Sequence, residues 1–386
     1  MIRTGVNRCL FAVDLPMAQP DGDRMNDRYV VIMAGGKGER FWPESRLRRP
    51  KQLLPIAGEK PMLVQTIDRL PGLVPPENVL VLTNREQIDA VRVVCPHLPP
   101  ENIVAEPEGR DTAAAVALAV LLVKQRSPDA SLAMLPADHV IQDHGRFRSV
   151  LEVAFQTAEQ FPVLVTVGIV PTEPATGYGY IQRGEAMDAV DGRPVYRVRR
   201  FVEKPDPATA QEYLDSGDYF WNGGMFVWQV STVEAALAEH APDLRKSFAA
   251  MEEALAEGEG LEHVLAERFP KVAKISVDYA IMEKATNVVT IPADFDWDDV
   301  GAWPAAARHM QAIGEGNVAR GRAVVEKGSG NIIVSDRDHL VALVGCEDLI
   351  VVHTDDATLV CPRSEAQRIK SLVRRLGSDE ANRNLL

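Results

Sequence analysis

The chain has 386 residues, 46% of them hydrophobic and 25% charged, values that are typical of a folded globular protein and exclude a disordered chain. Its formal net charge of -13 argues against a general nucleic-acid-binding protein, because phosphate contacts need clustered lysine and arginine side chains. An anionic small substrate stays possible, since a local cationic pocket can form on an acidic protein.

The cysteines and the apolar runs predict a cytoplasmic protein without a membrane span. The four cysteines are scattered, with neither a C-x-x-C pair nor a histidine at zinc-ligand spacing, which favours reduced thiols. No apolar run approaches the roughly 20 residues that a membrane helix requires. Residues 1–27 match a signal peptide poorly, because Asp14 and Pro16 interrupt their apolar stretch. We expect a disordered extension there, or sequence upstream of a start at Met25.

From Tyr29 onward, short apolar runs alternate with periodic, helix-like segments. The runs predicted as strands are 29–34, 79–83, 102–105, 131–135 and 163–167. The segments predicted as helices are 62–70, 85–94, 111–125 and 147–160. This alternation is typical of an α/β fold with a doubly wound sheet, mixed but mainly parallel, in which ligands bind beyond the carboxyl ends of the strands.

The last part of the chain has a different pattern. From residue 317 to residue 361, short Val/Ile runs recur at about ten-residue spacing, separated by Gly, Asp and Asn, which predicts a small β-rich, β-helix-like module. A final helix is expected to place Ile369, Leu372, Val373 and Leu376 on one face. We therefore expect a larger domain over residues 28–315 and a C-terminal module over 316–386.

A glycine-rich turn with many cations follows the first predicted strand, in the run VIMAGGKGERFWPESRLRRPKQLLPI over residues 31–56. Gly35, Gly36 and Gly38 allow backbone N–H groups to approach an anion closely. Five cations follow within 12 residues: Arg40, Arg46, Arg48, Arg49 and Lys51. The run is neither a Walker A loop nor a dinucleotide fingerprint, and it suits a triphosphate. A turn followed by a solvated basic loop is the alternative.

This run resembles the signature G-G-x-G-x-R-[LF]-W-P-x-S-R-x-x-x-P-K-Q of sugar-nucleotide pyrophosphorylases, and specifically of the mannose-1-phosphate guanylyltransferases. Further matches follow in order: EP (106–107), RDTA (110–113), LPADH (135–139), PATGYGYI (174–181), FVEKP (201–205), WNGGMF (221–226), DYAIME (278–283) and WDDVGAW (297–303). The resemblance covers residues 29 to about 360, and collinear motifs are far more specific than one alone. Asp111 and Gly223 depart from it, since many relatives have Asn and Ser there.

The resemblance implies a nucleotidyltransferase whose catalytic domain spans residues 28–315 and whose substrates are GTP and mannose 1-phosphate. The sugar phosphate attacks the α-phosphorus in line, and GDP-mannose and pyrophosphate form with the help of Mg²⁺. A thymidylyl- or uridylyltransferase acting on glucose 1-phosphate, and a catalytically silent regulatory subunit, stay open. The chain ends soon after the β-rich module, so we expect a short form without a fused isomerase domain. Edge strands of that module are compatible with a homodimer.

The resemblance also implies roles for single residues. Arg40 and Lys51 are the expected catalytic residues, the first on the triphosphate and the second bridging phosphates in the transition state. The expected nucleotide-binding residues are Gly35, Gly36, Gly38, Arg110, Asp111 and Thr112. The expected sugar-phosphate residues are Gly179, Glu203, Lys204 and Asn222, for which an exposed salt bridge and a turn are the alternatives.

Asp138 and Asp299 are the metal-binding pair that the resemblance implies, with Asp298 as the second choice. Asp138 follows a predicted strand, where a side chain can project into a ligand crevice, although an Asp at such a place is more often a cap or turn residue. His139 is not expected to act as a general base, because the attacking phosphate is already ionised at neutral pH. We interpret it as a structural residue.

Overall fold

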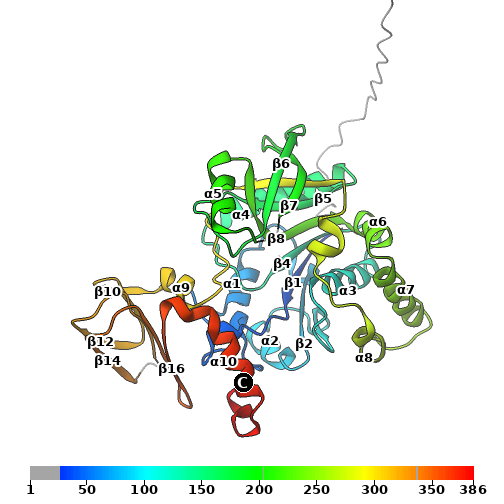
Figure 1. Ribbon diagram of the computed structural model, residues 1–386. Coiled ribbons are helices and arrows are strands. Elements are labelled where there is room, and N and C mark those ends of the chain that lie inside the picture. Colours follow the sequence, from blue (N-terminus) through cyan, green and yellow to red (C-terminus); the bar gives the residue numbers. More distant parts are fainter. Residues whose placement is uncertain (1–26, 203, 336–337) are drawn as a thin grey trace, which may run out of the picture.

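The structure is a computed structural model that describes residues 27–202, 204–335 and 338–386 (Figure 1). Of the extension expected over residues 1–27, only Asp27 is therefore described. Glu203, one of the expected sugar-phosphate residues, also lies outside the described residues. Over the described ranges, no helix is long and apolar enough to cross a membrane.

The larger domain is built on one mixed sheet with the strand order β3-β2-β1-β4-β8-β5-β9-β7-β6. Its strands are β1 (Arg28–Ala34), β2 (Val79–Asn84), β3 (Ile103–Glu106), β4 (Ser131–Pro136), β5 (Leu164–Ile169), β6 (Tyr180–Ala186), β7 (Tyr196–Val202), β8 (Tyr219–Gln229) and β9 (Val288–Ala293). Strands β1 to β4 are mutually parallel, β5 is parallel to β9, and β7 and β8 are antiparallel to their neighbours. All the other strands of this sheet therefore run in one direction, which confirms the expected mixed, mainly parallel sheet.

Helices cover both faces of this sheet. They are α1 (Met62–Asp68), α2 (Ile88–Val94), α3 (Thr112–Lys124), α4 (His144–Gln160), α5 (Pro207–Ser216), α6 (Val230–His240), α7 (Pro242–Ala256) and α8 (Leu261–Arg268). Helix α9 (Trp303–Ala306) instead packs in the core that it shares with the C-terminal module. Val30 and Ile32 of β1 pack in one core with α1, α2 and α4, whereas Val31 packs in another with α3, α6, α7 and α8. This alternation of side chains along β1 follows from the two-residue period of a strand and makes the domain doubly wound.

Local hydrogen bonds explain where two helices differ from the prediction. The segment expected to be helical from residue 85 becomes helical only at Ile88, because the backbone N–H of Arg85 donates to the Glu106 carbonyl at the end of β3. Conversely, α4 begins at His144, three residues before the predicted start, because the Asp143 side chain accepts a hydrogen bond from the Arg146 N–H and caps the helix.

The C-terminal module is a short β-helix, as expected. One of its sheets contains β10 (Gln311–Gly314), β11 (Asn317–Arg320), β13 (Ile332–Val334), β15 (Leu349–His353) and β16 (Thr358–Pro362). The other contains β12 (Arg322–Glu326) and β14 (Leu340–Val344). Successive coils of the chain stack through parallel strand pairs. These pairs are β11 with β13, β13 with β15, and β12 with β14. Strand β10 pairs with β11, so strand pairing in this module already begins at Gln311.

Helix α10 (Ile369–Gly377) follows the module and lies beside the beginning of the larger domain (Figure 1). Ile369 is buried, and Val373 and Leu376 pack partly against the same core, but Leu372 is exposed. The predicted apolar face is therefore narrower than expected, because only the i, i+4 and i+7 positions meet the core. That core also contains Phe41 and Trp42, so the module packs directly on the segment that follows the glycine-rich turn.

Candidate active site

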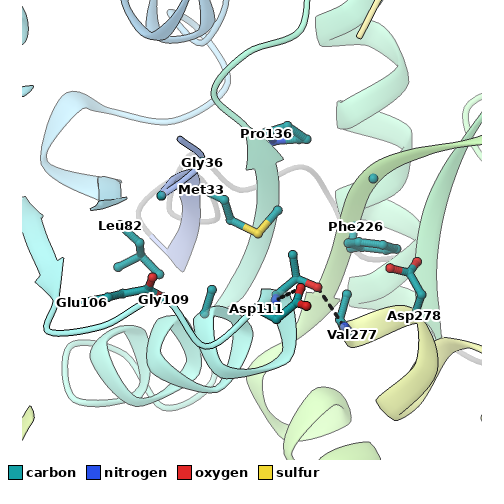
Figure 2. A pocket seen from close by; sticks show the side chains of 14 residues that line it. Met33, Gly36, Leu82, Glu106, Gly109, Asp111, Pro136, Phe226, Val277 and Asp278 are labelled. Atoms are coloured by element: carbon teal, nitrogen blue, oxygen red, sulfur yellow. Dashed lines mark hydrogen bonds between the residues drawn. The ribbon is translucent and has the colours of Figure 1, made fainter. Parts of the chain in front are cut away.

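The glycine-rich turn lies at the carboxyl end of β1, between two adjoining cavities. The first, of about 380 Å³, is lined by apolar side chains such as Met33, Leu82 and Phe226, and by Gly35 and Gly36 (Figure 2). We call it the apolar cavity. The second, of about 420 Å³, is lined by Lys37, Gly38, Arg40, Lys51, Asp138 and Asp299, among others. We call it the charged cavity.

Side chains from three segments hold the carbonyl groups of the glycine-rich turn. Gln52 Nε2 donates to the carbonyls of Ala34 at 2.6 Å and of Gly36 at 3.0 Å. Asn84 Nδ2 donates to the Gly35 carbonyl at 2.6 Å, and Ser45 Oγ to the Gly38 carbonyl at 2.7 Å. With these carbonyls occupied, the turn has a fixed shape, which is the condition for a preformed anion-binding loop.

Gly38 allows Lys51 to approach the turn closely. Its φ of 64° lies in the left-handed region, and a Cβ built on it would lie 2.5 Å from Lys51 Cβ and 2.8 Å from the Lys51 backbone nitrogen. Both features require glycine. Arg40 lines the same charged cavity, and its buried Nε atom has no hydrogen-bond partner among the described residues. A buried guanidinium donor without a partner, in a cavity, fits an anionic ligand.

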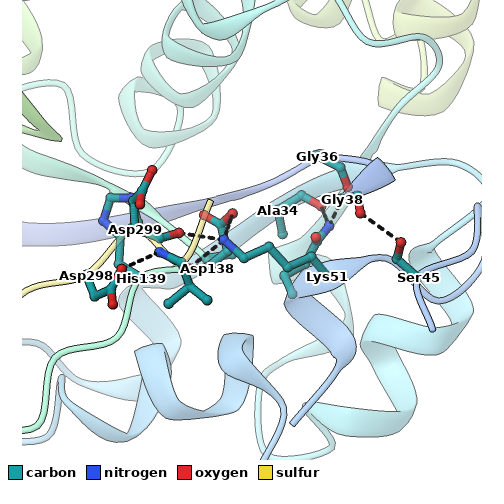
Figure 3. A network of polar contacts seen from close by, with 12 residues as sticks. Ala34, Gly36, Gly38, Ser45, Lys51, Asp138, His139, Asp298 and Asp299 are labelled. Carbon is teal, nitrogen blue, oxygen red and sulfur yellow. Dashed lines mark hydrogen bonds and ion pairs between the residues drawn. The ribbon is translucent and has the colours of Figure 1, made fainter. Parts of the chain in front are cut away.

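The ammonium group of Lys51 connects the two expected metal-binding residues (Figure 3). Its Nζ atom donates to Asp138 Oδ2 at 2.8 Å, to the Asp138 carbonyl at 3.1 Å and to the Asp299 carbonyl at 2.6 Å. The half-buried Asp138 would have a raised pKa from burial alone, but the charge of Lys51, the Lys51 hydrogen bond and, at acidic pH, the protonated His139 ring outweigh burial and lower that pKa. The structure thus brings Lys51, Asp138 and Asp299 together.

Asp298 and Asp299 are neighbours in the chain but have different surroundings. Asp298 is buried, and its carboxylate accepts hydrogen bonds from Arg308, His309 and the Val300 backbone. Although burial opposes ionisation, these donors lower the pKa of Asp298 to about 2. Asp299 lines the charged cavity, and its Oδ1 accepts a 3.0 Å hydrogen bond from the Tyr178 hydroxyl. Burial raises the pKa of Asp299. Asp298 is thus a structural residue, and Asp299 is the one that faces the cavity.

His139 lines the charged cavity, and Trp297 holds its ring in place. Its Nδ1 accepts a 3.1 Å hydrogen bond from Trp297 Nε1, and the two rings meet edge to face. Burial lowers the pKa of His139 to about 4, so the imidazole is neutral near pH 7. A neutral imidazole fixed by an indole supports its interpretation as a structural residue.

Glu106, at the end of β3, is a candidate site residue that the sequence motifs did not assign to a role. It lines the apolar cavity, it is buried, and its Oε1 atom has no hydrogen-bond partner among the described residues (Figure 2). Burial raises the pKa of the Glu106 carboxyl group to about 7. The only sequence signal was its place in the Glu-Pro motif after a strand. An unpartnered buried carboxyl group indicates a ligand that donates hydrogen bonds.

Asp111 and Thr112 form another wall of the apolar cavity, where α3 begins. Asp111 has φ 67° and ψ 177°, a conformation costly for any residue but glycine, and its side chain accepts a hydrogen bond from the Thr112 N–H. Thr112 Oγ1 accepts from the Val277 N–H at 2.8 Å, which fixes the start of α3 to the segment before Asp278. Strain of this kind concentrates at functional sites.

The other predicted residues lie at varying distances from these cavities. The Asn222 N–H donates to the Gly179 carbonyl at 2.8 Å, and Asn222 Nδ2 donates to Asp278 Oδ1, on the wall of the apolar cavity. The predicted pair Gly179 and Asn222 is therefore brought together. Lys204 follows β7, is exposed and has φ 36°. Arg110 contacts Glu108 and the Pro270 carbonyl and is not among the residues that line either cavity.

Comparisons with known proteins agree with this geometry. A model of the nucleotidyl transferase family matches residues 29–316, and one of the mannose-phosphate isomerase/GMP-like β-helix domain matches residues 321–376. A mannose-1-phosphate guanylyltransferase of Escherichia coli is 42% identical over 345 residues, which cover 89% of this chain and 72% of that relative. The xanthan biosynthesis protein XanB of Xanthomonas campestris pv. campestris (strain B100) is 37% identical over 355 residues, covering 92% of this chain and 74% of XanB.

A similar crystal structure also exists, of a mannose-1-phosphate geranyltransferase from Thermus thermophilus. It has a TM-score of 0.79 and 37% identity, and the match covers 91% of this chain and 99% of that one. The fold and the paired cavities therefore define a nucleotidyltransferase, an enzyme class that the sequence predicted. The chain belongs to the nucleotidyl transferase family and, within it, to the mannose-1-phosphate guanylyltransferases.

Proposed function

We propose that the chain makes GDP-mannose and pyrophosphate from GTP and mannose 1-phosphate. The observation that carries this proposal is the buried, unpartnered carboxyl group of Glu106 in an apolar cavity that adjoins the charged cavity of Lys51, Asp138 and Asp299. An apolar cavity with one polar anchor suits a nucleobase, and a charged one suits phosphates. Two relatives that match 89% of this chain, from Escherichia coli and Klebsiella pneumoniae, are mannose-1-phosphate guanylyltransferases.

Glu106 supports guanine as the base. The Watson–Crick edge of guanine presents two adjacent donors, N1–H and the exocyclic amino group, and an ionised carboxylate has two oxygens that accept in parallel. Adenine presents an acceptor at N1 instead, and uracil and thymine present a single donor between two carbonyl oxygens. Any of these bases leaves a carboxylate oxygen unpaired or facing an acceptor, which a buried site disfavours strongly.

Asp138 and Asp299 would hold the Mg²⁺ ion that the family implies. Both carboxylates line one cavity, and oxygen ligands are those that Mg²⁺ prefers. Among the described residues, no group of three or more His, Cys, Asp or Glu side chains is placed to hold a metal, which fits an ion held by two carboxylates and by substrate phosphates. Such an ion would neutralise phosphate charge during the transfer.

The residues of the chain act by positioning and by charge. The turn from Gly35 to Gly38 and the Arg40 guanidinium bind the triphosphate. When the nucleotide binds, Lys51 exchanges the Asp138 carboxylate for a phosphate oxygen and bridges phosphates in the transition state. A phosphate oxygen of mannose 1-phosphate then forms a bond to the α-phosphorus while the bond to pyrophosphate breaks, so no general base and no protein nucleophile is needed.

The sugar phosphate would be bound from the side of β6 to β8. Lys204 supplies a positive charge for its phosphate, and Asn222 and the backbone at Gly179 contact sugar hydroxyl groups. We include Glu203 among the sugar-binding residues only because of its position in the FVEKP motif. Arg110 can bind the nucleotide only if its guanidinium group exchanges the Glu108 carboxylate for a phosphate group. A cytoplasmic location and a homodimer also remain proposals.

The test is pyrophosphate release with Mg²⁺ across GTP, ATP, UTP and dTTP, each combined with mannose 1-phosphate and with glucose 1-phosphate. Release chiefly from GTP with mannose 1-phosphate is the expected result. Preference for another pair would overturn the substrates while leaving the reaction type in place. No release in any combination, from protein shown to be folded by circular dichroism, would favour a silent regulatory subunit.

A further inference from the structure

We propose, on the basis of the proposed function, that Lys370 of the C-terminal helix α10 binds the β- and γ-phosphates of the nucleotide and the departing pyrophosphate. The C-terminal module would then complete the active site as well as pack against it. Lys370 lines the charged cavity together with Lys37, Arg40 and Lys51, although it lies 319 positions after Lys51 in the chain.

The ion pair of Lys370 leaves its ammonium group available for exchange. Its Nζ lies 3.8 Å from Glu39 Oε2, which is close enough for charge attraction but too far for a hydrogen bond. The Lys370 side chain is 43% exposed. A phosphate group carries more charge than the Glu39 carboxylate and has several acceptor oxygens, so it competes well for this cation. Glu39 thus acts as the counterion of Lys370 when no phosphate is bound.

Packing fixes the backbone of α10, whereas the Lys370 side chain is partly exposed. Ile369, directly before Lys370, is buried in the core that contains Phe41 and Trp42, and α10 packs on the turn of residues 39–41. Beyond α10, the Leu385 carbonyl accepts hydrogen bonds from Trp42 Nε1 and from Arg46. The distance between Lys370 and the glycine-rich turn is therefore set by packing on both sides of the residue.

The order of residues along the turn indicates which phosphates Lys370 meets. Gly35 and Gly36 line the apolar cavity, where the base is proposed to bind, whereas Gly38 and Arg40 line the charged cavity. Lys370 pairs with Glu39, at the end of the turn that is farther from the apolar cavity. A nucleotide with its base in the apolar cavity and its phosphates along the turn presents its terminal phosphates to Lys370.

The test compares Lys370→Ala with Arg368→Ala in the full chain. Arg368 is a matched control because it also lies in the C-terminal segment and pairs with a glutamate, Glu365, but is 81% exposed and lines neither cavity. We expect Lys370→Ala to raise the KM for GTP, and for pyrophosphate in the reverse reaction, by about tenfold, the effect of one charge-assisted hydrogen bond. The KM for mannose 1-phosphate should be unchanged, and Lys370→Arg should restore most of the loss.

Three outcomes separate this inference from the proposed function. If Lys370→Ala behaves like Arg368→Ala, or raises the KM for mannose 1-phosphate equally, the role of Lys370 is wrong. If the unmodified chain releases no pyrophosphate, the proposed function is wrong. In that case calorimetric binding of magnesium pyrophosphate still tests Lys370, because equal affinity of the unmodified chain and Lys370→Ala would overturn its role. Equal thermal midpoints of the variants check that they fold.

Discussion

The indole Nε1 of Trp42 donates a 2.8 Å hydrogen bond to the carbonyl of Leu385, across 343 positions of sequence. This bond joins the segment after the glycine-rich turn to the last turn of the chain. It is part of a wider attachment, because Arg46 contacts Leu385 and Asp356, and Arg320 contacts Glu44 and the Pro55 carbonyl. The residues around the glycine-rich turn are thus held by the C-terminal module.

Trp42→Phe tests that attachment, because phenylalanine keeps an aromatic ring and removes the N–H donor. Losing a hydrogen bond of this kind costs about 1 kcal/mol, which is a drop of roughly 1–3 °C in Tm for a chain of this size. Trp228→Phe is the matched control, because Trp228 is buried and its Nε1 has no hydrogen-bond partner among the described residues. Thermal unfolding of both variants measures the difference. An equal drop in both would show that lost ring volume, and not the bond to Leu385, is responsible.

Gly38→Ala and Gly36→Ala should separate folding of the turn from ligand binding. At Gly38 an added Cβ meets Lys51 at 2.5 Å in a left-handed backbone, so we expect lower stability, by about 1–3 kcal/mol, together with a large loss of kcat. At Gly36 nothing lies within 4 Å of an added Cβ, so stability should stay within about 0.5 kcal/mol. The KM for GTP should still rise, because the added methyl group points into open space beside the apolar cavity. Denaturant unfolding and initial rates together check both expectations, and equal stability losses would contradict them.

The two adjacent aspartates offer a second paired test. Asp299→Asn should lower kcat by orders of magnitude with little loss of stability, because Asp299 faces the cavity and is proposed to hold Mg²⁺. Asp298→Asn should instead lower the free energy of unfolding by about 2–3 kcal/mol, because the buried carboxylate loses its charged hydrogen bonds with Arg308 and His309. If Asp298→Asn abolished activity with unchanged stability, the assignment of the two residues would be reversed.

The stability difference at Asp298 should depend on pH in a defined direction. The pKa of Asp298 in the folded chain is about 2, below its ordinary value of 3.8. The stabilisation by this carboxylate is therefore present above pH 3.8 and is lost as the pH falls toward 2. Unfolding curves of the unmodified chain and of Asp298→Asn should converge across that window, and a constant difference down to pH 2 would contradict the lowered pKa.

The sequence predicted the parts of the site that follow directly from strand ends and motif order. Asp138 follows β4, and Gly35 follows β1, so the parallel sheet alone brings them to one edge. By contrast, Lys370 and Leu385 reach the turn because the β-helix and α10 pack on it, and no local pattern specifies that docking. Their contacts depend on a core shared by residues more than 300 positions apart.

The role of Glu106 escaped the sequence prediction for a related reason. Glu106 is a candidate because its carboxyl group is buried and its Oε1 atom has no hydrogen-bond partner among the described residues. Neither property can be seen in the sequence. The opposite case is Arg110, which motif order assigned to the nucleotide, whereas its guanidinium contacts Glu108 and the Pro270 carbonyl. Motif order specifies the neighbourhood of a residue, but the direction of a long side chain depends on which acceptors packing brings near it.

Glu106 should make GTP binding dependent on pH near neutrality. Its pKa, raised to about 7 by burial, means that a large fraction of the chain has a protonated Glu106 at pH 6, and a protonated carboxyl group cannot accept from both donors of guanine. The KM for GTP should therefore fall as the pH rises from about 6 to 8, whereas the KM for mannose 1-phosphate, measured at saturating GTP, should show no matching change.

Glu106→Gln should raise the KM for GTP by about 10- to 100-fold and flatten its pH dependence, because an amide offers a single acceptor oxygen that does not titrate near pH 7. Glu108→Gln is the control, because it removes the same charge from a glutamate only two residues away whose side chain is 56% exposed.

The Glu106→Gln substitution should also change stability in the absence of nucleotide. The raised pKa of Glu106 stabilises the fold below pH 4.5, and this stabilisation is lost as the pH rises through 7. Glu106→Gln should thus gain stability relative to the unmodified chain over that window. If the KM of Glu106→Gln for GTP kept the pH dependence of the unmodified chain, a group other than Glu106 would be responsible for recognising the base.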